Sequence, residues 1–333
     1  MNDHRGDDTV RRRSARHALR IAVVVAVVAL LIAFARRVDW RAVIVVARGA
    51  DTMLLAAALA CNLVSLTLKG VRWWVFLRPV GVRSLPLVLR ATYAGASLNN
   101  LVVAQGGEGA RVLIVSRASG VSSAHVLAAL AVERALDAVS YLVLLGGAAW
   151  LLPLPEHIAR WRSAGIATLL AAMCALVALG VVARRAARTP RASAPPHVPS
   201  YLRRFVRGVA EVGSPSRITA ALVISLAAWA LQVATYHLTV AAVHLPLPAA
   251  GSVAAMLAVG ISFLVRATPG NVGVFQAVYA LTVRSFGIGE SDAVAAALLI
   301  QAVQVLPVLL LGSLVTLPVG RRAARPTEGA RRG

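Results

Sequence analysis

The chain consists largely of long apolar runs that are separated by short polar segments. The runs are rich in Ala, Val and Leu and lack the strict alternation of apolar and polar residues that marks barrel strands, so they predict helices. Several approach the roughly 20 apolar residues that a helix needs to cross a bilayer. The runs expected to cross it cover residues 21–35, 53–68, 124–152, 164–183, 218–243 and 293–317. The pattern predicts an all-α, polytopic membrane protein.

Two stretches, residues 98–137 and 263–304, break this pattern with polar and turn-forming residues. In each stretch a glycine-containing break is followed by a short apolar helix, residues 110–119 in the first and 277–286 in the second. Neither helix is long enough to cross a bilayer. The sequence therefore predicts two interrupted helices inside the membrane.

The two breaks share a common spacing, which indicates a weak internal repeat. Gly106 precedes Gly120 by 14 residues, and Gly273 precedes Gly287 by 14. A long helix follows each break, and polar residues recur in it at comparable positions. They are Glu133, Arg134 and Asp137 in the first half and Gln301 and Gln304 in the second.

Basic residues gather beside the apolar runs, as topology signals do. They divide the chain into a basic tail (residues 1–20), a first membrane half (21–183), a basic linker (184–217), a second membrane half (218–318) and a second tail (319–333). We expect both tails and the linker in the cytoplasm of a bacterial cell, at its inner membrane. Six spans and two oppositely oriented re-entrant hairpins satisfy this, in an inverted repeat typical of transporters. Eight full spans satisfy it too, but need very short helices.

Two segments near the first spans carry signals of the membrane surface. Residues 36–51 favour a short amphipathic helix that lies in the interface. At the end of the second span, Trp73 and Trp74 lie beside Lys69 and Arg72. Tryptophan next to basic residues is typical of a membrane interface, so we place these four side chains there.

Composition supports the membrane assignment and excludes other classes. Hydrophobic residues make up 59% of the chain, against about 45–50% in soluble proteins. The net charge of +22 lies mainly in the segments beside apolar runs, so we infer no nucleic-acid partner. Cys61 and Cys174 lie in separate apolar runs. Neither metal-ligand spacing nor a phosphate-binding loop occurs, so no metal site and no cofactor is expected.

The charges in the first long helix are candidates for function, because ionisable groups inside a membrane are costly. Glu133 and Asp137 are four residues apart and share one helix face. If this helix begins near Ser123, Glu133 lies about 15 Å deep at 1.5 Å per residue. Arg134 could pair with Glu108, Asp137 or a lipid phosphate. The alternative is an ion-pair cluster that only holds helices together.

The first break offers a candidate anion site. Gly106 and Gly107 permit close approach to the backbone N–H groups that begin the next helix, and Arg111 adds positive charge. Glu108 opposes an anion unless the arginines outweigh it, and could instead cap the helix. Asn99 and Asn100 could contact a head group, or could cap or cross-link helices.

The second break is marked by a strong turn signal, Pro269 and Gly270 followed by Gly273. Gln276, Gln301 and Gln304 lie around it in sequence. These amides could bind a polar head group, or they could form hydrogen bonds between helices.

These residues resemble the motifs of a known family. The flippase-like integral membrane family that includes the N-terminal transmembrane region of lysylphosphatidylglycerol synthases shows an Asn, then Gly-Glu with an Arg three positions on, a Gly-Val-Ser/Thr turn and a Glu-Arg-x-x-Asp helix. The matching positions are Asn99 or Asn100, Gly107, Glu108, Arg111, Gly120, Val121, Ser122, Glu133, Arg134 and Asp137. A second motif, Pro-x-Gly-x-Gly and a Glu, is similar to Pro269, Gly270, Gly273 and Gln276. Two departures are the missing Pro before Gly-Glu and the Gln in place of Glu.

The resemblance covers roughly residues 18–317 and implies translocation or presentation of a lipid. The expected partners are membrane lipids with an anionic or phosphate-bearing head group, either a phospholipid or a polyprenyl-linked lipid. Alternatives are a non-transporting scaffold for a lipid- or envelope-modifying partner enzyme, and an intramembrane enzyme that uses Glu133 and Asp137. No soluble aminoacyl-transferase domain follows the last span, so we expect no synthesis of an aminoacylated lipid.

Overall fold

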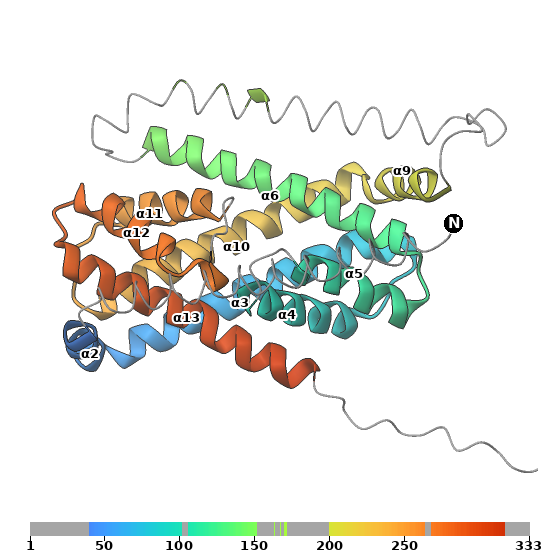
Figure 1. Ribbon diagram of the computed structural model, residues 1–333. Helices are drawn as coiled ribbons and strands as arrows, with labels where there is room; N and C mark the ends of the chain where they lie inside the picture. The colour runs from blue at the N-terminus through green and yellow to red at the C-terminus, as the bar shows by residue number, and fades with distance from the viewer. Residues whose placement is uncertain are drawn as a thin grey trace, which may run out of the picture.

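The computed structural model describes residues 40–101, 106–151, 200–263 and 268–316, with the single positions 163, 167, 170 and 171. The expected first span, most of the span over residues 164–183, the proline-rich part of the linker and both tails lie outside the described residues. Within the described parts every regular element is helical (Figure 1). The expected all-α fold is confirmed.

Long helices form the body of the molecule. α3 (Thr52–Leu77), α10 (Pro215–Ala242) and α13 (Glu290–Thr316) have 26 to 28 residues and are apolar enough to cross a membrane. α6 (Ser123–Leu151) has a similar length, with 29 residues, but carries buried charge. At 1.5 Å per residue these helices are roughly 40 Å long. Figure 1 shows them running along the same long dimension of the molecule.

Two hairpins of short helices lie between them. α4 (Leu85–Leu101) packs against α5 (Gly106–Ser119), and α11 (Ala249–Ser262) packs against α12 (Val274–Arg284). α5 and α12 are only about 21 Å and 17 Å long at 1.5 Å per residue. The helices therefore favour two hairpins over eight full spans.

The hairpins enter the molecule from opposite ends. The N–H of Asp51, at the start of α3, donates to the carbonyl of Ala242 at the end of α10. The first hairpin starts just after α3 ends, and the second starts just after α10 ends. Because α3 and α10 pack side by side in opposite directions, the hairpins point toward each other. Their tips meet, since α4 contacts the short 3-10 helix η3 (Pro269–Asn271) (Figure 1).

Glycine explains the close packing of the first hairpin and the ends of the short helices. A methyl group on Gly107 would lie 2.0 Å from the carbonyl oxygen of Gly95, so the two backbones touch at this point. Gly120 and Gly287 follow α5 and α12 with φ angles of +71° and +84°. Only glycine adopts that region without strain, which is why it ends helices so often. The matched spacing in the sequence thus marks two matched turns.

The interpretation of Arg72 and Trp73 as interfacial residues was wrong. α3 continues past residue 68 to Leu77, and both side chains are 0% exposed. Arg72 is buried because carboxylates on another helix neutralise it. Trp74 fits the surface assignment better, since it is half-buried, donates to the carbonyl of Arg83 and lies under the guanidinium of Arg78.

Two further helices lie in segments that the sequence treats as peripheral. α2 (Trp40–Arg48) is the expected short helix before the second span, and it contacts α13. Its position in the membrane interface stays a prediction. α9 (Ser200–Val212) lies in the segment expected as a linker and packs along α6. A methyl group on Gly208 would lie 2.9 Å from Cβ of Ala128, so this part of the segment is attached to the first half.

Candidate functional site

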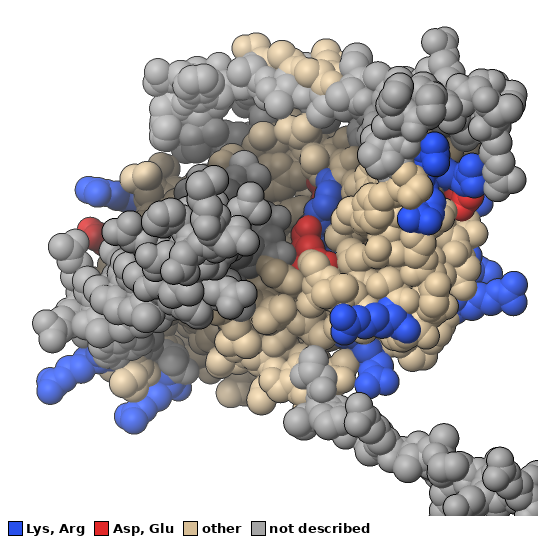
Figure 2. All heavy atoms as spheres, turned by 45° about the vertical axis from the view of Figure 1, so that its right-hand side comes forward, with Lys and Arg blue, Asp and Glu red and all other residues tan. Residues whose placement is uncertain are grey.

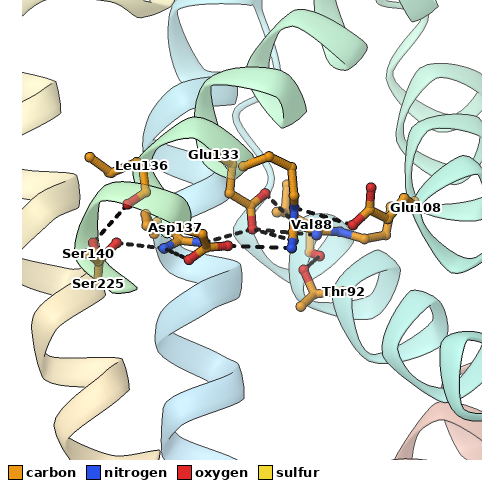
Figure 3. Close-up of polar contacts among 11 residues, drawn as sticks. Val88, Thr92, Glu108, Glu133, Leu136, Asp137, Ser140 and Ser225 are labelled. Atoms are coloured by element: carbon orange, nitrogen blue, oxygen red, sulfur yellow. Dashed lines mark hydrogen bonds and ion pairs between the residues drawn. The ribbon is translucent and has the colours of Figure 1, made fainter. Parts of the chain in front are cut away.

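Glu133 is the centre of a buried ion-pair cluster. Its carboxylate oxygens lie 3.0 Å from Nη2 of Arg72 and 2.9 Å from Nη2 of Arg111. The three residues come from α6, α3 and α5, and all three side chains are buried. Figure 3 shows the carboxylate between these helices. Glu133 thus joins the first hairpin to two long helices.

Asp137 extends the cluster by one helical turn. Arg72 donates to Asp137 Oδ1 at 2.5 Å and to the hydroxyl of Ser225, on α10, at 2.6 Å. Arg72 therefore bridges both carboxylates of α6 and reaches the second half of the chain. The predicted sharing of one face by Glu133 and Asp137 is seen directly in Figure 3.

Arg134 closes the cluster on its open side. It lies 3.3 Å from Glu108, 3.4 Å from Glu133 and 3.5 Å from Asp137, measured between guanidinium nitrogens and carboxylate oxygens. Its side chain is 47% exposed. On the face in Figure 2, acidic side chains are visible in a central hollow beside a basic one. The pairings of Arg134 with Glu108 and Asp137 match the expectation from sequence.

The charges of the cluster balance. Three arginines face three carboxylates, and each carboxylate has at least one arginine within ion-pair distance. The guanidinium of Arg111 also lies 4.0 Å above the ring of Trp73. Burying charge is costly unless it is paired and hydrogen-bonded. The arrangement accordingly fits the alternative that these charges hold helices together, and it leaves Arg72 and Arg111 without spare capacity for an anion.

The two amides of the first break act on the backbone. Asn99 Oδ1 accepts a hydrogen bond from the N–H of Gly107 at 2.9 Å, which caps the start of α5. Asn100 donates to the carbonyl of Ala96. Glu108 lies in the first turn of α5, where the helix dipole favours a carboxylate.

The second break is closed by an amide network between helices. The N–H of Gly273 donates to Gln276 Oε1 at 2.7 Å, and Gln276 Nε2 donates to Gln301 Oε1 at 2.6 Å. Gln301 Nε2 then donates to the carbonyl of Gly270 at 2.6 Å. Gln276 therefore performs by hydrogen bonding what a helix cap needs, and no charge is required at this position.

A cavity of about 240 Å³ lies where the two hairpin tips meet. Its wall is formed by both tips and by α3, α10 and α13. The predicted residues that line it are Asn100, Gly270, Gln301 and Gln304. The polar or aromatic side chains that line it and that sequence reasoning missed are Asn62, Lys69, Trp229, Gln232 and Tyr236.

The predicted site residues thus fall into three groups. Glu108, Arg111, Glu133, Arg134 and Asp137 form one cluster. Four others line the cavity, as described above. The remaining five shape the backbone of the two breaks, and they are Asn99, Gly107, Pro269, Gly273 and Gln276. A lipid-binding role for any of them stays a prediction.

Arg72 is the most important residue that sequence reasoning missed. A signal for it exists, because the apolar pattern continues beyond it as far as Leu77. Its partner Glu133 lies 61 positions away, and only the fold brings the two together.

The family model described as the lysylphosphatidylglycerol synthase TM region matches residues 19–312. The chain belongs to this family. The resemblance found in its motifs is confirmed, and the chain is an integral membrane protein of lipid-related function. The matched model is the membrane region of the family and not a catalytic domain.

Part of the chain is also similar to a protein named glycosyltransferase AglD from Haloferax volcanii. The two are 32% identical over 139 residues, which is 41% of this chain and 22% of that protein. The chain therefore corresponds to a minor part of that relative's length.

Proposed function

We propose that this protein binds a phosphate-bearing lipid, either a phospholipid or a polyprenyl-linked lipid, and moves it between the two leaflets of the membrane. The observation that carries the proposal is the meeting of two oppositely directed hairpins at a partly polar cavity inside the molecule. Non-helical backbone deep in a membrane is tolerated where it is buried in protein or lines a cavity. Transporters built from inverted repeats place their binding sites at such breaks.

Movement of one half against the other would open the cavity to each side in turn. The neutral ion-pair cluster attaches the first hairpin to α3 and α6, and the amides of Gln276 and Gln301 attach the second hairpin to α13. Each hairpin therefore moves together with its own supporting helices. The cluster serves as the rigid frame of the first half in this mechanism.

The comparisons support a role for the membrane region that does not depend on one transfer reaction. The family is named for lysylphosphatidylglycerol synthases, and the relative that shares part of the region is named as a glycosyltransferase. A region common to proteins with such different names fits a lipid-handling module better than the chemistry of either.

The bacterial inner membrane is the proposed location, with both termini in the cytoplasm. At the end of the molecule where the first hairpin starts, the turns carry Arg78 and Arg83, and Arg117 and Arg217 lie in the adjoining helix ends. Arginine-rich turns favour the cytoplasmic side. The first hairpin would then enter from the cytoplasm and the second from outside.

Reconstitution into vesicles tests the proposal. Vesicles that contain the protein and a trace of head-group-labelled phospholipid or polyprenyl phosphate are treated with a membrane-impermeant quencher. We expect the pool protected from the quencher to exchange in protein-containing vesicles and to persist in protein-free ones. Equal protection in both, for every lipid class tried, would contradict transport and favour the scaffold alternative.

A further inference from the structure

We infer that the cavity between the hairpin tips binds the phosphate group of the lipid, with the ammonium of Lys69 as its counter-ion and the indole N–H of Trp229 as a hydrogen-bond donor. This inference rests on the proposed function and names its site. It moves the anion site from the arginines of the first break, which the sequence favoured, to a cation on α3.

Lys69 differs from the nearby arginines in its surroundings. It lies three residues before Arg72 on α3 and is the single lysine among 35 basic residues in the chain. Its ammonium lies 5.2 Å from the ring centroid of Trp229, and both residues line the cavity. Among the described residues Lys69 forms no ion pair, whereas Arg72, Arg111 and Arg134 each form at least one.

The nearest carboxylate does not remove this positive charge. Asp137 acts electrostatically on Lys69, but its oxygens are bonded to Arg72 and Arg134. The adjoining cluster is neutral without Lys69, so Lys69 leaves a net charge of one on the cavity side. One monovalent anion, such as the phosphodiester of a lipid, matches that charge.

Trp229 provides a second and independent indication of a ligand. Its indole nitrogen is buried and has no acceptor among the described residues. A buried donor without a partner is costly, and most such groups in proteins are bonded to something. The ring packs edge-on against Tyr141, with 5.5 Å between the ring centroids, which limits its rotation. A phosphate oxygen in the cavity would supply the missing acceptor.

The size and lining of the cavity suit a head group rather than a whole lipid. Its volume of about 240 Å³ lies just below the roughly 300–1,000 Å³ of pockets that bury drug-sized ligands. Opposite Lys69 the wall contains the amides of Asn100 and Gln301, which come from the two halves of the chain. A bound head group would contact both hairpin tips or their supports, so its binding is coupled to their movement. The acyl chains would remain outside.

Binding to purified full-length protein tests the site. The probes are dioctanoyl phosphatidylglycerol, dioctanoylglycerol, which lacks the phosphate, and inorganic phosphate, each titrated and followed by native mass spectrometry. We expect the phospholipid to bind the unmodified protein. Because hydrogen bonds to charged groups are worth more than neutral ones, Lys69→Gln should weaken its binding about tenfold to a hundredfold. Trp229→Phe keeps the ring and should weaken it less, and Lys69→Arg should restore part of it.

Arg284→Gln is the matched control, because Arg284 is exposed at the end of α12 and its loss removes the same charge away from the cavity. All variants are compared as monodisperse protein of equal thermal stability. Phospholipid binding that Lys69→Gln and Arg284→Gln change equally would overturn the site and leave the proposed function intact. Dioctanoylglycerol binding as tightly as the phospholipid would also overturn it. Binding of inorganic phosphate alone would replace the lipid by a free anion. Absence of phospholipid binding, together with absent leaflet exchange, would instead reject the proposed function.

Discussion

Removing the charge of Glu133 should destabilise the protein strongly, although the substituted side chain keeps its shape. Glu133→Gln takes the carboxylate from Arg111, whose printed ion-pair partner within the described residues is Glu133 alone. Arg72 keeps Asp137. Breaking a buried pair by removing one partner costs about 3–5 kcal/mol, because a buried charge is left uncompensated. We expect a loss of free energy of unfolding in that range.

The assay is a denaturant titration of the purified protein in mixed micelles, followed by tryptophan fluorescence. Glu290→Gln is the control, because Glu290 is exposed in the first turn of α13 and should lose at most about 1 kcal/mol from the helix dipole. Combining Glu133→Gln with Arg111→Gln should cost clearly less than the sum of the single changes, since the second change removes the orphaned charge. A loss below about 1 kcal/mol for Glu133→Gln, or strict additivity in the double variant, would refute the role of the cluster as a frame.

Three further predictions concern the hairpins. Gly107→Ala should prevent α4 and α5 from packing and sharply lower the yield of folded protein, because its methyl group would meet the carbonyl of Gly95, whereas Gly109→Ala has open space and should be tolerated; equal yields of the two variants would contradict the close contact. Gln301→Leu should lower the free energy of unfolding by about 1–3 kcal/mol, since it leaves buried amide and carbonyl groups unpaired, and an unchanged value would show that the amide network is dispensable. With the native cysteines replaced, Ser84→Cys and Ser285→Cys, which lie exposed at the starts or ends of opposite hairpins, should react with impermeant maleimide from opposite sides of the membrane; reaction of both from one side would reject the opposed hairpins.

The breaks could be predicted from sequence because their signals are local. Gly120 and Gly287 end helices by adopting a positive φ, and Pro269 and Gly270 interrupt the backbone. The face shared by Glu133 and Asp137 follows from helix periodicity alone. These features need no knowledge of which helices are neighbours.

The composition of the site could not be predicted, because its contacts join distant parts of the chain. Arg72 meets Glu133 across 61 positions, and a tryptophan next to it carried the ordinary signal of a membrane interface. Lys69 and Trp229 line one cavity only because α3 and α10 pack side by side. Apolar periodicity shows that a charge is buried, but it does not show which opposite charge neutralises it.

The position of a bound lipid tests the central claim most directly. A phospholipid with a photoreactive head group is cross-linked to the protein in membranes, and the modified peptides are identified by mass spectrometry. We predict labelling of the cavity wall, in the segments around Met256 to Phe263 and around Gln301 to Val305, with competition by unlabelled phospholipid. Labelling confined to exposed outer positions such as Leu281 and Leu310, without competition, would contradict a head-group site between the hairpin tips.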